Sequence, residues 1–464
     1  MADRNLKAVL APSILRAYDI RGVVNGGFGE NDLYTIGRAF GSEMAERGLS
    51  KACVGYDGRL SSPMLEAALV DGLVSTGMQV MRAGLGPSPM LYFATVTCGA
   101  DAGLMITGSH NPPEFNGLKM TLEGKAFFDE DIQNLGRRVE AGTFTDGTGE
   151  AFEVSVFDQY VARVLMDYLG GKELRVAWDP GNGAAGEVTK ELVAKLPGEH
   201  FVINAEIDGT FPAHHPDPTV EKNLAQLKEL VAANDCDLGI GFDGDGDRIG
   251  VIDKLGNVMW GDQLLVMLAR DVLAEHPGAP ILCDVKASRV FFDEIQKMGG
   301  RPVMWKAGHS HIKSKMAELN APLAGEMSAH IFFKHRYYGY DDAVYTAVRL
   351  LSVIANADES FTEMLAALPK MHNTPEIRFD CPDDRKFDVV DEISARARAL
   401  DDVEIFDMDG VRVETPSGWW LLRASNTQPM LVVRCESDTE EGLERLKDDV
   451  RAQLVQSGVD PGAI

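Results

Sequence analysis

Segments that read as strands and segments that read as helices alternate along most of this chain. The alternation starts at the apolar run 52–56, and it starts afresh at 173–178 and near Val258. Short apolar runs bounded by turns predict buried strands, and the segments between them carry apolar residues at helical spacing. Such alternation is typical of α/β units with a largely parallel sheet. We therefore predict an α/β fold of three consecutive α/β domains with mixed, largely parallel sheets, at residues 1–155, 156–256 and 257–369.

The pattern changes after residue 369. Short strands such as 411–415 and 419–423 alternate with charged helices such as 439–456. This order of strands and helices favours a smaller C-terminal α+β domain at residues 370–464. The segment from Leu368 to Pro375 reads as a hinge, and we expect the last domain to open and close about it.

The chain is strongly acidic, with 71 Asp and Glu against 45 Lys and Arg and a formal net charge of −26. A protein with this negative charge repels nucleic acid and anionic membranes. It also repels phosphate esters unless Lys and Arg side chains cluster locally. The six cysteines form no close pair, and no apolar run reaches the length of a membrane span. We predict a cytoplasmic protein without a nucleic-acid or membrane partner, and no obligate protein partner is implied.

A stiff polar loop is predicted between Thr107 and Lys119. It follows the apolar run 103–106 and is rich in Gly, Asn and Pro, which form turns. Ligand sites in open α/β sheets lie at such carboxyl ends of strands, and a serine there can be a nucleophile or a phosphate carrier. Ser109 is therefore a candidate functional residue, although a surface turn with an incidental serine is the commoner interpretation of this stretch alone.

Three carboxylates alternate with glycines in the segment Asp243-Gly-Asp-Gly-Asp-Arg248, directly after the apolar run 238–242. Asp243, Asp245 and Asp247 can converge on one hard cation such as Mg²⁺, because glycine lets the backbone fold tightly. A calcium-binding EF-hand loop does not fit, since Arg248 stands where that loop needs Gly and Lys254 where it needs Glu. A solvated acidic turn stays open as the alternative.

Other polar loops also follow apolar runs. Glu326 and Ser328 could hydrogen-bond the hydroxyls of a small polar ligand. Arg423 begins a loop with hydroxyl and amide groups that suits a phosphate. His309 and Lys286 suit proton transfer or phosphate contact. Taken alone, an ordinary loop is the better interpretation of the stretch with Glu326 and Ser328, and a capped turn explains the Arg423 loop equally well.

Gly181, Gly183 and Gly186 have the spacing of a dinucleotide-binding turn, and Glu206 stands where such a site has an acidic residue. Asp179 lies just before the first glycine, where its carboxylate would face the pyrophosphate. We interpret these glycines as serving a tight turn from a strand into a helix, and we do not expect a nicotinamide site.

Together these loops resemble the α-D-phosphohexomutase superfamily, and specifically its bacterial phosphomannomutase/phosphoglucomutase branch. The resemblance covers the whole chain and keeps the motif order of the family. It implies four domains around one central active-site cleft. The motifs are Arg-Ala-Tyr-Asp-Ile-Arg-Gly at 16–22, Thr-Gly-Ser-His-Asn-Pro at 107–112, Asp-Gly-Asp-Gly-Asp-Arg at 243–248, Gly-Glu-Met-Ser-x-His at 325–330 and Arg-x-Ser-Asn-Thr-x-Pro at 423–429.

The resemblance also implies a role for each matching residue. Ser109 would be the catalytic serine, carried as phosphoserine, and its phosphate would join Asp243, Asp245 and Asp247 around Mg²⁺. The other residues implied to be catalytic are Tyr18, Arg21, Lys119, Arg248 and His309. The residues implied to bind substrate are Lys286, Gly308, Glu326, Ser328, His330, Arg423, Ser425, Asn426 and Thr427; of these, Glu326 and Ser328 would read the sugar and the last four would hold the phosphate that is not transferred.

The reaction implied is the reversible interconversion of hexose 1-phosphate and hexose 6-phosphate, for glucose and mannose. It would pass through a hexose 1,6-bisphosphate, and glucose 1,6-bisphosphate would serve as activator and intermediate. Ala329 departs from the family pattern, which usually has Gly at that position, and this leaves open how well each epimer is accepted. Three alternatives remain: a mutase that prefers glucosamine phosphate, a serine-dependent phosphohydrolase, and a non-catalytic calcium-binding module.

Overall fold

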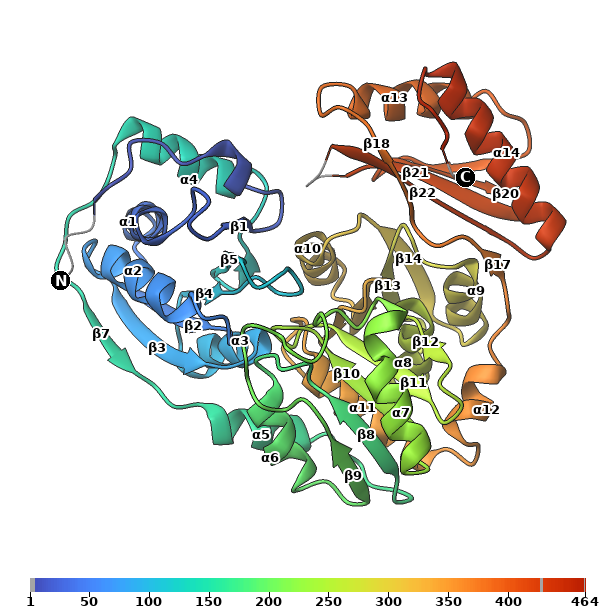
Figure 1. Ribbon diagram of the computed structural model, residues 1–464, viewed down its shortest axis with the longest axis horizontal. Helices are drawn as coiled ribbons and strands as arrows, with labels where there is room; N and C mark the ends of the chain where they lie inside the picture. The colour runs from blue at the N-terminus through green and yellow to red at the C-terminus, as the bar shows by residue number, and fades with distance from the viewer. Residues whose placement is uncertain (1–4, 426–428, 463) are drawn as a thin grey trace.

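The computed structural model describes residues 5–425, 429–462 and 464. Within these residues the strands form four sheets, which follow one another along the chain and define four units (Figure 1). We refer to them as the first, second, third and C-terminal units. The first three contain both parallel and antiparallel pairs, and the last is antiparallel throughout. The predicted fold class is thus confirmed.

The first unit holds the predicted serine loop at the end of a central strand. Its sheet consists of β1 (Ile20–Val23), β5 (Phe115–Leu122), β4 (Ala102–Ile106), β2 (Lys51–Tyr56), β3 (Gln79–Leu85) and β7 (Glu150–Glu153), with β6 (Lys125–Ala126) beside β5. Its helices are the 3₁₀ turn η1 (Pro12–Ile14), α1 (Glu30–Glu46), α2 (Ser62–Val74), α3 (Ser88–Thr97) and α4 (Glu130–Ala141). The polar loop is shorter than predicted, because β5 begins at Phe115 and carries Lys119 in a strand antiparallel to β4.

The second unit places the acidic loop in a hairpin. Its sheet order is β12 (Val258–Met259), β11 (Ile249–Asp253), β10 (Leu238–Phe242), β8 (Arg175–Asp179) and β9 (Glu199–Val202). Its helices are α5 (Phe157–Leu165), α6 (Gly186–Val193), the 3₁₀ turn η2 (Glu221–Leu224) and α7 (Ala225–Ala233). Since β10 and β11 are antiparallel neighbours, the segment 243–248 must turn sharply between them.

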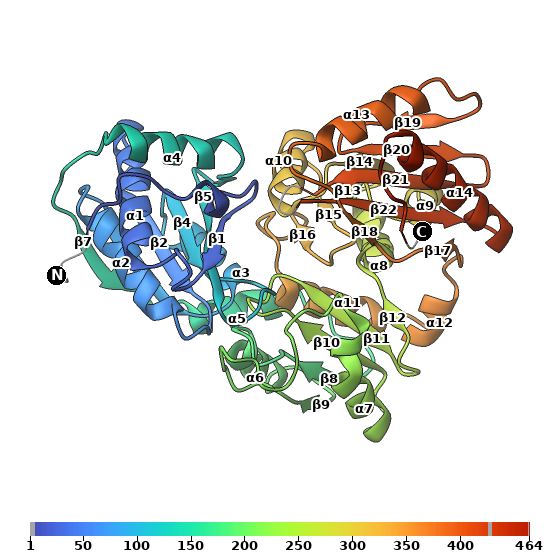
Figure 2. The same cartoon turned by 45° about the horizontal axis from the view of Figure 1, so that its top comes forward.

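The third unit has the sheet order β14 (Arg301–Trp305), β13 (Pro280–Asp284), β15 (Leu323–Gly325) and β16 (Ile331–Phe333). Its helices are α8 (Gly261–Glu275), α9 (Arg289–Lys297), α10 (His309–Leu319), α11 (Ala343–Asn356) and α12 (Phe361–Ala366). Helix α10 lies on the side that faces the first unit in both ribbon views (Figures 1 and 2). Its first residue, His309, contacts the first unit, with its ring centre 6.3 Å from that of Tyr18.

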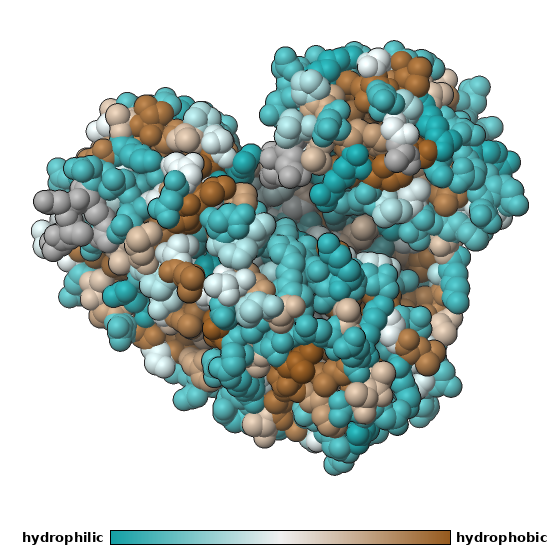
Figure 3. Space-filling view, viewed as in Figure 1, coloured by the Kyte–Doolittle hydropathy of each residue, from teal (hydrophilic) through white to brown (hydrophobic). Residues whose placement is uncertain are grey.

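The C-terminal unit pairs β17 (His372–Asn373), β22 (Met430–Ser437), β21 (Gly418–Ala424), β20 (Val411–Thr415) and β19 (Glu404–Phe406), with β18 (Ile377–Asp380) also on β22. Helices α13 (Lys386–Ala397) and α14 (Glu440–Gln456) cover it. It stands opposite the first unit, and the space-filling view shows a hollow between these two lobes (Figure 3).

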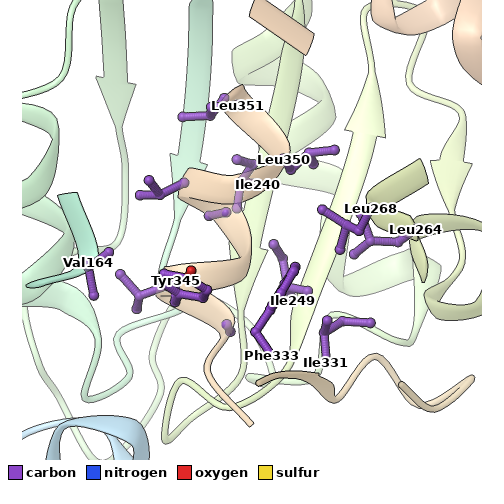
Figure 4. Packing of buried hydrophobic residues seen from close by; sticks show 14 of the residues in the cluster. Val164, Ile240, Ile249, Leu264, Leu268, Ile331, Phe333, Tyr345, Leu350 and Leu351 are labelled. Atoms are coloured by element: carbon purple, nitrogen blue, oxygen red, sulfur yellow. The ribbon is translucent and has the colours of Figure 1, made fainter. Parts of the chain in front are cut away.

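The second and third units share one apolar core. Ile240 of β10, Leu264 of α8, Phe333 of β16 and Leu350 of α11 belong to the same buried cluster (Figure 4). Helix α11 contacts α5 and β11 as well as α8, although it follows the third sheet in sequence. The C-terminal unit has a separate core. We keep the four ranges given above as proposed domain limits, with the qualification that α11 serves two units.

Candidate active site

Ser109 lies at the carboxyl end of β4, where its side chain is buried and its backbone is left-handed, with φ of 49°. Its Oγ donates a hydrogen bond to Oδ2 of Asp243 at 2.9 Å, and it also lies 3.2 Å from Nδ1 of His110. The first and second units therefore meet at this hydroxyl. A left-handed conformation is costly for a residue other than glycine, and it commonly marks a functional position.

The three aspartates of the β10–β11 turn converge, with one oxygen of each within 4.8 Å of the others, and all three side chains are buried. Oδ1 of Asp243 accepts hydrogen bonds from the backbone N–H groups of Asp247 and Arg248. Oδ1 of Asp245 and Oδ1 of Asp247 have no hydrogen-bond partner among the described residues. Burial and the charges of Asp245 and Asp247 raise the pKa of Asp243 well above its ordinary value. Buried, crowded carboxylates with unpaired oxygens fit a hard divalent cation.

Lys119 and Ser88 hold this acidic turn from the first unit. Nζ of Lys119 lies 2.7 Å from Asp245 and 2.5 Å from Asp247. Burial lowers the pKa of Lys119, but the two carboxylates offset this and raise it well above its ordinary value, so the amine stays charged. Ser88, at the start of α3, donates to Asp245 at 2.5 Å. The sequence predicted Lys119 and missed Ser88, which stands in no recognisable motif.

Arg248 connects the acidic turn to the third unit. Its Nε donates to Nε2 of His330 at 3.0 Å. Because arginine cannot accept, a neutral His330 carries its proton on Nδ1, which lies 3.1 Å from Oδ2 of the buried Asp341. His309 stacks on His330 with ring centres 5.5 Å apart, and burial lowers its pKa well below the ordinary value. The sequence predicted the arginine and both histidines; Asp341 was missed.

Glu326 and Ser328 lie in the tight turn between β15 and β16. Oε1 of Glu326 accepts the backbone N–H of Gly308 at 2.6 Å, and Ser328 is half-buried beside it. Ala329 has φ of 67°, a conformation that favours glycine. Its carbonyl accepts the N–H of Ile249, so this turn is fastened directly to the strand that leaves the acidic turn.

Arg423 lies at the end of β21 and forms a two-pronged ion pair with Asp409 at 2.9 Å. Asp409 also accepts the N–H of Ala307, and the hydroxyl of Tyr18 donates to the carbonyl of Ala307. The carbonyl of Ser425 accepts from Lys386. Asn426 and Thr427, both predicted phosphate ligands, lie outside the described residues.

Arg21 and Lys286 flank these groups. The Arg21 guanidinium donates to Asn111 and to Asp19. Lys286 lies between Asp284 at 3.6 Å and Glu376 at 3.4 Å, at the junction of the third and C-terminal units. Its ammonium is thus already surrounded by acids.

A cavity of about 210 Å³ opens between the first, third and C-terminal units. Tyr18, Ala307 and Asp409 line it together with Lys306 and His311. The structure therefore brings the predicted residues into two groups: one around Ser109 and the acidic turn, and one around Ala307, Glu326 and Arg423.

The glycines at 181–186 form the turn from β8 to α6. A side chain at Gly183 would meet the carbonyl oxygens of Asp243 and Gly244 at 2.9 Å, and the N–H of Ala184 donates to Gly244. This turn therefore supports the acidic turn. No helix in the described part of the chain is long and apolar enough to cross a membrane.

Models of the phosphoglucomutase/phosphomannomutase family match nearly the whole chain. Those described as alpha/beta/alpha domains I, II and III match residues 12–146, 156–256 and 260–372, and that of the C-terminal domain matches 376–453. The phosphomannomutase/phosphoglucomutase of Pseudomonas aeruginosa is 44% identical over 445 residues, which are 96% of each chain. The phosphoglucomutase of Neisseria meningitidis is 41% identical over 450 residues, 96% of this chain and 98% of that protein. A solved phosphoglucomutase/phosphomannomutase family protein from Burkholderia thailandensis is 40% identical, with a TM-score of 0.92 over 99% of both chains.

Proposed function

Because the chain belongs to the phosphoglucomutase/phosphomannomutase family, we propose that it interconverts the 1-phosphates and 6-phosphates of glucose and mannose and that Ser109 carries the transferred phosphoryl group. The single observation that supports this role best is the position of the hydroxyl. The hydroxyl is buried and lies 2.9 Å from one of three converging carboxylates, and the Ser109 backbone at the end of the strand is left-handed.

In the proposed reaction a phosphoryl group on Ser109 passes to the free hydroxyl of a hexose monophosphate, which becomes a 1,6-bisphosphate. The bisphosphate then turns end over end, and its other phosphate returns to Ser109. Phosphoryl transfer depends mainly on alignment and charge neutralisation. Lys119 and Arg248 supply positive charge at the acidic turn, which Ser109 contacts through Asp243.

The hydroxyl that accepts the phosphoryl group must lose a proton. Two imidazoles can take it. His309 is kept neutral by its lowered pKa. Nε2 of His330 becomes free if Arg248 turns from it to a phosphoryl oxygen, and Asp341 would then hold the proton on Nδ1.

We assign Mg²⁺ to Asp243, Asp245 and Asp247, because the three buried carboxylates converge and Asp245 and Asp247 each have an unpaired oxygen that suits a small divalent cation. When bound, the ion would neutralise negative charge on the phosphoryl group and on the three carboxylates. Glucose 1,6-bisphosphate would load Ser109 with its first phosphate.

The second group of residues would bind the rest of the substrate. Glu326 and Ser328 would read sugar hydroxyls, beside the N–H of Gly308. The distal phosphate would lie near Arg423, with Tyr18, Arg21 and Lys286 around it. Ser425, Asn426 and Thr427 complete this proposed cradle. We place the enzyme in the cytoplasm, because all six cysteines are unpaired.

The test is a substrate panel. Wild-type protein, Ser109→Ala and the control Ser13→Ala, which alters an exposed serine, are given Mg²⁺, a trace of glucose 1,6-bisphosphate, and the 1-phosphates of glucose, mannose and glucosamine. We expect conversion of the glucose and mannose esters without release of phosphate, and a loss of at least about 10³-fold in Ser109→Ala.

Preferential conversion of the glucosamine ester would favour the glucosamine branch, and net phosphate release would favour a phosphohydrolase. Near-normal turnover by Ser109→Ala would refute the assignment of the serine.

A further inference from the structure

Ser109 adopts a backbone conformation that it would not hold by itself. A φ of 49° is strained for a residue other than glycine, and such strain persists only where the surroundings impose it. The neighbouring Pro112 and Pro113 stiffen the loop but do not contact the Ser109 peptide groups in the described hydrogen bonds. The groups that hold Ser109 must therefore be sought beneath the loop.

The Arg59 guanidinium lies beneath the loop and is 1% exposed. It donates to the carbonyl oxygens of Ser109 at 2.7 Å, Asn111 at 2.6 Å, Pro112 at 2.6 Å and Phe115 at 3.0 Å. One planar fork thus satisfies four carbonyls of the serine loop and of the start of β5. The single ammonium group of a lysine could not donate to all four carbonyls in this way.

Asp57 fixes the guanidinium and the other side of the serine peptide. Its Oδ2 accepts from Nε of Arg59, from the Thr107 hydroxyl and from the N–H of Gly108. Thr107 Oγ1 in turn accepts the N–H of Ser109 at 2.8 Å. Arg59 therefore holds the carbonyl of Ser109, and Thr107 holds its N–H, with both anchored on one buried carboxylate.

The second unit seals this arrangement from water. The ring of Phe211 lies over the Arg59 guanidinium at 5.1 Å. A side chain at Gly209 would meet the Arg59 Cα at 2.4 Å, so the two backbones touch. At Gly108 a side chain would meet the Arg59 Cζ at 2.5 Å, which shows how closely the guanidinium lies under the loop. Arg59 faces the loop backbone and is covered, so it cannot serve as a phosphate ligand in the cleft.

We propose that Arg59, anchored by Asp57, is the positioning residue that keeps Ser109 in its left-handed conformation and so aims Oγ at the acidic turn. This inference rests on the proposed role of Ser109. A misplacement of about 1 Å at a reacting atom can cost about 100-fold in rate. Arg59 does not contact the sugar or its distal phosphate, so its loss should reduce kcat and leave KM unchanged.

The test compares Arg59→Lys with Arg349→Lys. Arg349 is equally buried, paired with Asp271, and lies on α11 outside the site. We expect Arg59→Lys to lose about 100-fold in kcat with KM within about twofold, while Arg349→Lys loses stability but keeps kcat within about twofold. In Arg59→Ala, millimolar guanidinium should restore part of kcat, and sodium chloride at equal ionic strength should not.

If Arg59→Lys does not fold, the near-isosteric Thr107→Val removes the acceptor of the Ser109 N–H, and kcat should fall about tenfold at unchanged KM. Wild-type kcat in the folded Arg59→Lys or Thr107→Val protein would overturn the proposal, and so would an equal loss in Arg349→Lys. An inactive wild-type protein in the same assay would count against the proposed function instead, because the proposal on Arg59 concerns only differences from an active parent.

Discussion

The junction between the second and third units differs in kind from the junction between the third and C-terminal units. The former is an apolar core to which β10, β11, α8, β16 and α11 all contribute. The latter has only a small apolar cluster, Val285, Trp419 and Leu421, and it contains buried charge. Arg412 donates to the carbonyls of Val285 at 2.7 Å and Ala287 at 2.6 Å, and Glu436 accepts from Ser288 and from the N–H of Arg289.

The difference predicts which parts move. Apolar contacts have no partner in water, so separating the second and third units would expose their shared core. Hydrogen bonds to carbonyls and carboxylates can be exchanged for water at a modest net cost. We therefore expect the second and third units to move as one rigid body. The C-terminal unit should open and close about the segment 368–375, and this motion would carry Arg423 toward and away from Ala307.

The substitution with the largest expected effect is Phe333→Ala, which tests whether the second and third units share one core. Phe333 is 1% exposed and packs against Tyr345 of α11, so its loss leaves a cavity in the shared core. Urea unfolding should show a loss of about 3–5 kcal/mol, felt by both units together. The control Phe152→Ala, on the exposed edge strand β7, should change stability by less than about 0.5 kcal/mol. Separate unfolding steps for the two units would contradict the shared core.

At the polar junction the matching change is Arg412→Met. It leaves two carbonyls and Glu414 without their buried donor, at a cost of about 3 kcal/mol. Hydrogen exchange should rise in β20, β21 and the 285–289 turn, with β10 and α11 protected as before. The control is Arg398→Met, in which an exposed arginine of the same unit is changed. Faster hydrogen exchange in α11 would mean that the C-terminal unit does not open independently of the second and third units.

Acid should weaken the polar junction first. The charge of Lys286 lowers the pKa of Glu376 from 4.5 to about 2, despite an opposing effect of burial. A depressed pKa adds stability that is full above pH 4.5 and is lost as the pH falls through about 2. Glu376→Gln should therefore cost about 1–3 kcal/mol at pH 6 and progressively less toward pH 2. The exposed Glu404→Gln is the control, and a pH-independent difference would disprove the linkage.

The smallest effect should come from Ala329→Gly. The backbone at this position favours glycine, but glycine also gains freedom in the unfolded chain, so stability should change by no more than about 1 kcal/mol. A larger loss would show that the 325–330 turn, and not the apolar core, fastens the third unit to the second. Assays with glucose and mannose 1-phosphates will show whether the methyl group affects one epimer.

The elements that sequence predicted best have strong local patterns. The strands 238–242 and 411–415 were predicted with the bounds found in the structure. β5 was misread as loop because Asn116 and Gly117 usually form turns. In the structure Gly117 is required inside the strand, since a side chain there would meet the Ile20 carbonyl at 2.2 Å across the pair with β1. That close approach is a tertiary constraint with no local signal.

The same division holds for the site. Ser109, the three aspartates, Lys119 and Arg248 come from two segments that the sequence singles out, 107–119 and 243–248, and the structure brings these segments together. Arg59, Ser88 and Asp409 act through contacts between segments far apart in the chain, and Asp341, which contacts the nearby His330, stands in no recognisable motif. A single sequence does not reveal such contacts. The position of α11 across two units was unpredictable for the same reason.

The place of α11 also bears on how the protein is made. All the strands of the second sheet have been synthesised by residue 259, yet α11 (Ala343–Asn356), which packs on β11 and α5, emerges from the ribosome much later. Until then a nascent chain exposes Ile240 and Ile249 to the surrounding solution. We therefore expect a fragment that ends at residue 256 to aggregate.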